Sequence, residues 1–131
     1  MSCKSCVYGA NTASQNIVDG GTINFGSIVR RFGNNTNIAG GNGVVIGEGY
    51  YDIDTNITFT AAAGTVTIAL YKDGVPITGA TATRTTAATS SYTITIPALV
   101  RQKCCCESVI TAVLTGEDTT VTNAAIIIEK V

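Results

Sequence analysis

The chain has 131 residues and a mass of 13.5 kDa, which suits a single domain. Charged residues make up 13% of it, and a formal net charge of −1 argues against a nucleic-acid partner, which needs a basic surface for the phosphates. Histidine is absent, which excludes Ser-His-Asp and Cys-His enzymes and a His-ligated zinc hydrolase.

The first 21 residues predict an N-terminal arm or docking tail. They combine a C-x-x-C pair with small and polar residues, show little periodicity, and end at Asp19-Gly20-Gly21. They contain no apolar segment typical of a secretory signal peptide, and no run in the chain has the 18 apolar residues of a membrane span. We therefore expect synthesis in the cytoplasm and no membrane partner.

Residues 22–131 predict a series of short β-strands with turn signals between them. Residues 33–43 hold four glycines and four asparagines and predict a loop, whereas residues 81–89 predict a weak strand or a loop. The predicted strands cover residues 22–32, 44–46, 50–60, 65–71, 75–78, 91–96, 104–115 and 119–131.

The alternation of residue types supports these strands. Val66, Ile68 and Leu70 point to one face, whereas Thr65, Thr67 and Tyr71 point to the other. Asp73-Gly74 favours a tight hairpin turn, and Pro97 is expected to end the strand before it. No window shows a helical stripe, and the threonine content, 21 residues, suits a pleated surface. The pattern predicts an all-β sandwich or barrel.

The two strands closest to the C-terminus are apolar on both faces. In a two-layer sandwich one face of a strand normally meets water, so a doubly apolar strand is either covered by a loop or buried in a subunit contact. The low charge of the chain is consistent with such a contact. We therefore expect an oligomer.

Two segments carry a resemblance to a known family. Residues 49–53 (GYYDI) and 68–77 (IALYKDGVPI) resemble a strand and a hairpin of the tumour necrosis factor and complement globular-head superfamily, in its bacterial and phage branch. The resemblance implies a homotrimeric jelly-roll β-sandwich over residues 22–131, with the N-terminal arm outside it. It implies that the late strands line the threefold axis, without assigning a face. The candidate interface residues are Val109, Ile110, Thr111, Val113, Ile126 and Ile128.

The five cysteines leave three interpretations open. They are Cys3 and Cys6 in the C-x-x-C pair, and the consecutive Cys104, Cys105 and Cys106. The thiols could hold a zinc ion or an iron–sulfur cluster, form disulfides within or between chains, or stay reduced. Adjacent cysteines seldom ligate one ion, and we expect no metal and no other cofactor.

Asp52, Asp54 and Asn56 share one face of a predicted strand and present oxygen donors suited to calcium. The spacing lacks the later glycine and the closing glutamate of a calcium loop. A solvated strand surface is therefore the expectation.

The sequence offers no evident catalytic residue. Together with the resemblance and the missing signal peptide, this predicts a non-enzymatic structural protein of a phage virion. It would be a head fibre or a capsid decoration, assembled as a homotrimer and docked on the capsid or another virion protein through the arm. The alternative is a surface-exposed receptor- or glycan-binding module of the same fold, of the spore-surface or adhesin type. In that case the loops at residues 33–43 and 79–90 would carry recognition.

Overall fold

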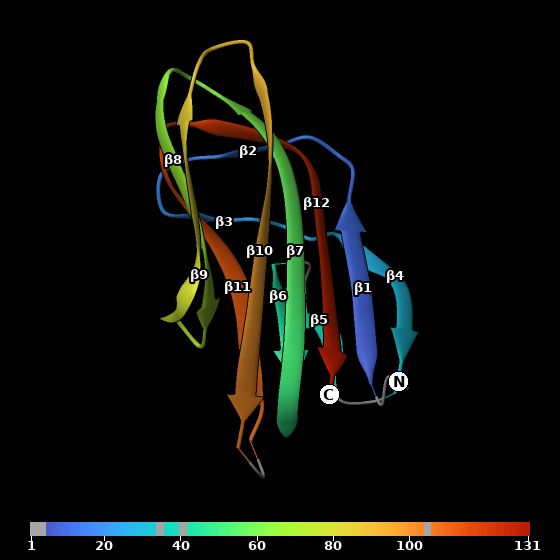
Figure 1. Cartoon of the computed structure of the whole chain (residues 1–131). Helices are drawn as coiled ribbons and strands as arrows, with labels where there is room; N and C mark the ends of the chain where they lie inside the picture. The colour runs from blue at the N-terminus through green and yellow to red at the C-terminus, as the bar shows by residue number, and fades with distance from the viewer. Residues whose placement is uncertain (1–4, 34–35, 40–41, 104–105) are drawn as a thin grey trace.

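The computed structural model describes residues 5–33, 36–39, 42–103 and 106–131, which form two packed antiparallel sheets (Figure 1). Sheet A has the order β10-β7-β12-β1-β4, with β2 also paired to β12. Sheet B has the order β5-β6-β11-β8-β9, with β3 also paired to β11. The strands are β1 (Cys6–Asn11), β2 (Gln15–Ile17), β3 (Gly21–Thr22), β4 (Ser27–Phe32), β5 (Thr36–Ala39), β6 (Gly43–Ile46), β7 (Gly49–Ala61), β8 (Gly64–Lys72), β9 (Val75–Thr86), β10 (Ser91–Gln102), β11 (Ser108–Gly116) and β12 (Thr119–Lys130).

Alternation along the strands builds the core between the sheets. In β7, Tyr51, Ile53 and Ile57 are fully buried, whereas Asp52 and Asp54 face outward. Burying every second side chain on both sheets removes the apolar residues from water while the other face stays accessible. The predicted all-β jelly-roll sandwich is confirmed. Within the described residues, no helix is long and apolar enough to span a bilayer.

The predicted N-terminal arm is corrected by the structure. β1 pairs with β12 on one side and β4 on the other, β2 pairs with β12, and Val7 is fully buried. Residues 6–17 therefore belong to the sandwich. The strand is hard to detect in the sequence because Gly9 occupies its second inward position, where the side chain of Ile38 fills the space that a Cβ would need.

Several predicted boundaries also differ. β10 continues through Pro97, because it is an edge strand on which a missing N–H can be tolerated. β9 continues to Thr86, β5 forms within the expected loop at 33–43, and β11 begins at Ser108. The Asp73-Gly74 turn is confirmed, with φ of 52° and 81°.

Candidate oligomer interface

The outward face of sheet A carries aligned rows of side chains. The register places Leu99 opposite Asp52, Asp52 opposite Glu129, and Glu129 opposite Cys6, across β10, β7, β12 and β1. Phe32 of β4 lies opposite Cys6 and completes the row. Leu99 is 67% exposed and Phe32 61%, so large apolar side chains stand at both ends of this row.

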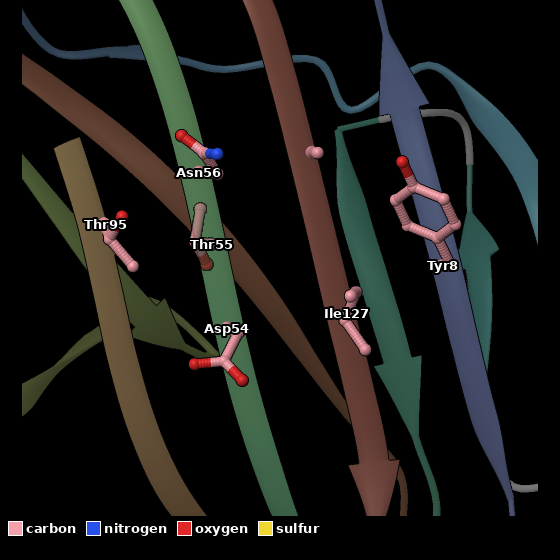
Figure 2. Close-up of a pocket in the computed structure, with 7 residues that line it drawn as sticks. Tyr8, Asp54, Thr55, Asn56, Thr95 and Ile127 are labelled. Atoms are coloured by element: carbon pink, nitrogen blue, oxygen red, sulfur yellow. The ribbon is translucent and has the colours of Figure 1, made fainter. Parts of the chain in front are cut away.

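The neighbouring row surrounds a shallow hollow of about 320 Å³. Figure 2 shows Tyr8 on β1, Ile127 on β12, Asp54 and Asn56 on β7, and Thr95 on β10 around it. Tyr8 and Ile127 are 37% and 38% exposed and form its apolar side. An apolar centre flanked by exposed leucine and phenylalanine, with polar groups between, is the composition of a protein–protein contact surface.

Three of the six interface residues predicted from the sequence expose no surface that a second copy could contact. Ile110, Ile126 and Ile128 are completely buried inside the single chain. Alternation explains the difference, because Ile126 and Ile128 point into the core and Ile127 between them points outward. An unbroken run of isoleucines conceals which of its members face the core, so Ile127 could not be singled out from the sequence.

Val109, Thr111 and Val113 face outward from sheet B, on the opposite side of the sandwich. In the register, Thr111 lies opposite Tyr71 and Val113 opposite Ala69. The neighbouring rows of β8 and β9 carry threonines, such as the pair Thr67 and Thr83, whose hydroxyls are 3.0 Å apart. These three candidates therefore lie on a neutral face, separate from the exposed aromatic and aliphatic side chains of sheet A.

The carboxylates on sheet A form a compact acidic patch, Asp52, Asp54 and Glu129. The prediction that Asp52, Asp54 and Asn56 share one face is confirmed. Within the described part of the chain, none of the three carboxylates makes a hydrogen bond or an ion pair. The described residues contain no group of three or more Cys, Asp or Glu side chains placed to hold a metal ion, so a calcium site gains no support.

Charged residues gather on the side of the sandwich where the edge strands β9 and β10 meet; they are Lys72, Arg101 and Lys103 with the carboxylates Asp73 and Glu107. Two adjoining hollows lie there and share Lys72, Asp73 and Arg101. Lys72 Nζ donates to the carbonyl oxygen of Arg101 at 2.8 Å, and the Arg101 guanidinium lies 5.8 Å from the ring centre of Tyr50. We call Lys72, Arg101 and the exposed Lys103 the basic side.

The turn beside this basic side is held by its aspartate. The Ser108 side chain, a hydrogen bond from the Val109 N–H and the charge of Lys72 lower the pKa of Asp73, whereas burial opposes them. Asp73 therefore stays ionised at neutral pH.

Cys6 faces outward on sheet A and is half-buried, whereas Cys106 is exposed in the connection between β10 and β11. Both are free thiols. Cys3, Cys104 and Cys105 lie outside the described residues, so the three interpretations of the cysteines stay open.

No protein-family model and no curated protein matches the chain. Solved structures match it along nearly their whole length. A crystal structure of murine APRIL has a TM-score of 0.78 at 12% identity, covering 97% of this chain and 98% of that chain. The globular domain of a zebrafish complement 1qA protein has a TM-score of 0.71 at 8% identity, with 98% and 97% covered. The PRD1 vertex protein P5 has a TM-score of 0.66 at 12% identity, with 100% and 99% covered. The chain has the jelly-roll fold that these proteins share.

Proposed function

We propose that the protein is a non-enzymatic homotrimer that forms part of a phage virion. The outward face of sheet A carries the proposal, because Tyr8, Ile127, Leu99 and Phe32 expose apolar surface on one side of the sandwich. A contact between copies would remove this surface from water. The outward face of sheet A therefore replaces Ile110, Ile126 and Ile128 as the proposed contact between copies.

Two further observations support this assignment. The fold is similar to that of a virion protein, the PRD1 vertex protein P5, over the whole chain. The outward rows of sheet B are neutral and rich in threonine, which suits fixed contacts with neighbours. We place attachment to the particle at the end of the sandwich where β1 begins beside the end of β12, since Cys6 lies opposite Glu129 there.

The oligomeric state tests the assembly. Native mass spectrometry at micromolar concentration is expected to show a trimer for the wild type and a shift to monomer for Leu99→Asp and Ile127→Asp. Val18→Asp is the matched control, because Val18 is 62% exposed but lies in the connection between β2 and β3. A wild-type monomer, or equal effects of all three substitutions, would contradict the proposal.

Attachment to the particle is tested with a deletion that ends before β1. Removing residues 1–18 would delete β1, β2 and the core residue Val7, and the protein would not fold. Removing residues 1–4 leaves β1 complete. We expect this variant to remain trimeric and to lose co-sedimentation with the particle; unchanged co-sedimentation would contradict attachment at this end.

A second candidate, a receptor- or glycan-binding module, is favoured by one feature. Thr89 adopts φ of 70° in the exposed turn between β9 and β10, and a β-branched residue rarely takes this conformation. The turn lies at the end of the sandwich opposite the end of β12 (Figure 1). Glycan-array binding that is lost when residues 87–90 are replaced by a shorter turn would support this candidate.

A further inference from the structure

β4 is an edge strand that the sandwich leaves largely uncovered. It closes one side of sheet A and pairs only with β1 (Figure 1), and all six of its residues are exposed. Within the described part of the chain, no backbone hydrogen bond joins its other edge to a loop or a strand. An edge strand of this kind offers a row of unpaired N–H and C=O groups to an extended chain.

The two edges of sheet A differ in how they are protected against such pairing. β10, the opposite edge, contains Pro97, which has no N–H to offer, and it meets the edge strand β9 of the other sheet. β4 contains no proline, and it carries arginines and a bulge instead, in which Val29 is the extra residue opposite Tyr8 and Gly9. Part of the protection of β4 is therefore electrostatic, so it depends on the charge of the partner.

Arg30 and Arg31 supply the charge on this edge. Arg30 lies opposite the outward-facing Tyr8 and Arg31 lies opposite the buried Val7, so the two side chains leave the strand on opposite faces of sheet A. Arg31 Nε donates to the carbonyl oxygen of Thr36 at 2.7 Å, and neither arginine makes an ion pair among the described residues. Each face of the edge therefore presents one positive charge without a carboxylate.

A second copy of this chain is a poor partner for β4. Full overlap of two β4 strands would gather the arginines of both copies, and like charges across a strand pair are unfavourable. Glu117 and Asp118 are the one consecutive acidic pair in the sequence, and they lie between β11 and β12 rather than in an extended strand. The complementary strand therefore comes from another protein.

The alternation of side chains defines the chemistry of that strand. Two consecutive carboxylates in an extended segment point to opposite faces, which matches the positions of Arg30 and Arg31. Apolar residues beside the carboxylates would cover Ile28 and Val29, which are exposed on β4. A segment of this type satisfies the backbone, the charges and the apolar side chains of the edge together.

We propose that β4 binds an extended acidic segment of another protein, which adds to sheet A as a further strand. The segment carries two consecutive aspartates or glutamates flanked by apolar residues. Ladder hydrogen bonds supply affinity, and the pairing of its carboxylates with Arg30 and Arg31 selects it. The inference goes beyond the proposed trimer, because the partner uses the edge of sheet A rather than its outward face.

A synthetic peptide tests the site. The peptide Val-Thr-Val-Glu-Glu-Val-Thr-Val, with a fluorophore at its N-terminus, is titrated with the full chain and followed by fluorescence anisotropy. We expect saturable binding to the wild type and slower hydrogen exchange of the amides of residues 27–32 in the complex. The double substitution Arg30→Glu and Arg31→Glu should weaken binding by about tenfold or more. The double variant should instead bind a peptide with lysines in place of the glutamates.

Two controls separate strand addition from general attraction between charges. A peptide whose central amides are N-methylated keeps both carboxylates but cannot form the ladder hydrogen bonds, and it should not bind. Arg84→Glu makes the same change of charge on β9 and should bind the glutamate peptide as the wild type does. If circular dichroism shows that the double variant is unfolded, Arg30→Glu alone takes its place.

Several results would overturn the inference. They are a wild type that does not bind the glutamate peptide, binding of the methylated peptide, and equal weakening by Arg84→Glu. A folded double variant that keeps the glutamate peptide, or that rejects the lysine peptide, would also overturn it. The oligomeric state is measured separately by native mass spectrometry, so failure of this inference is distinguishable from failure of the proposed trimer.

Discussion

Asp73 and Val109 are joined by two hydrogen bonds across one end of sheet B. The Asp73 N–H donates to the Val109 carbonyl oxygen at 2.9 Å, and the Val109 N–H donates to Asp73 Oδ1, also at 2.9 Å. The pair connects the β8–β9 turn to the start of β11, 36 residues further along the chain. One aspartate therefore holds the turn that lines the two hollows at the basic side.

This relationship predicts a pH-dependent stability. Replacing Asp73 by Asn keeps an acceptor oxygen and tolerates the positive φ, but removes the charge. We expect Asp73→Asn to lower the free energy of unfolding at pH 7 by about 1 kcal/mol or less, since the carboxylate is exposed and screened. Urea unfolding at a fixed protein concentration measures this difference in the free energy of unfolding.

The direction in which the stability changes with pH follows from the lowered pKa of Asp73 in the folded state. Its contribution is fully present above the pKa of an unfolded aspartate, about 3.9, and is lost as the pH falls through the lower folded value. The difference between wild type and Asp73→Asn should vanish in strong acid. Ser108→Ala should raise the pKa of Asp73 toward its ordinary value, measured by carboxyl NMR titration; an unchanged titration would contradict the role of Ser108.

Substitution of Gly116 is expected to strain the backbone and destabilise the fold. Gly116 has φ of 109°, and an added Cβ would fall on the carbonyl oxygen of Thr65. Gly116→Ala should therefore destabilise the fold by about 2 kcal/mol or more. Gly74 is the matched control, because it has φ of 81° but no atom within 4 Å of the added Cβ. Gly74→Ala should cost only about 1 kcal/mol. Equal losses in thermal unfolding would show that the Thr65 contact is unimportant.

Adjacent isoleucines of β12 should behave differently. Ile126 is completely buried in the core, whereas Ile127 is 38% exposed on the outward face of sheet A. Ile126→Ala should lower the free energy of unfolding by about 2–5 kcal/mol. Ile127→Ala should leave the unfolding of the monomer nearly unchanged and weaken the trimer. Denaturant unfolding and a dilution series separate the two effects, and a reversed pattern would place the wrong isoleucine in the core.

Thiol reactivity reports on the proposed contact surface. Cys6 lies on the outward face of sheet A and Cys106 lies outside it, exposed. In the trimer, iodoacetamide should label Cys106 rapidly and Cys6 slowly, because only Cys6 is covered by the neighbouring copy. In the Leu99→Asp variant, Cys6 should become reactive. Peptide mapping by mass spectrometry gives both rates, and rapid labelling of Cys6 in a wild-type trimer would locate the interface elsewhere.

The strand content could be predicted from local patterns. The alternation in Val66, Ile68 and Leu70 identified β8, and Asp73-Gly74 identified its turn, because both signals depend on neighbours in the sequence. β1 was missed, since its second inward position is a glycine that Ile38 of another strand covers. β10 was predicted too short, because the tolerance of Pro97 depends on the edge position of the strand.

The candidate site required long-range information for the same reason. Composition and alternation predicted an all-β chain, and the missing histidine excluded several enzyme classes. They could not assign Ile127 to the surface and Ile126 to the core, nor place Leu99, Asp52 and Glu129 in one row. Pairing register between distant strands makes these assignments, since a shift of one residue reverses every side chain of a strand.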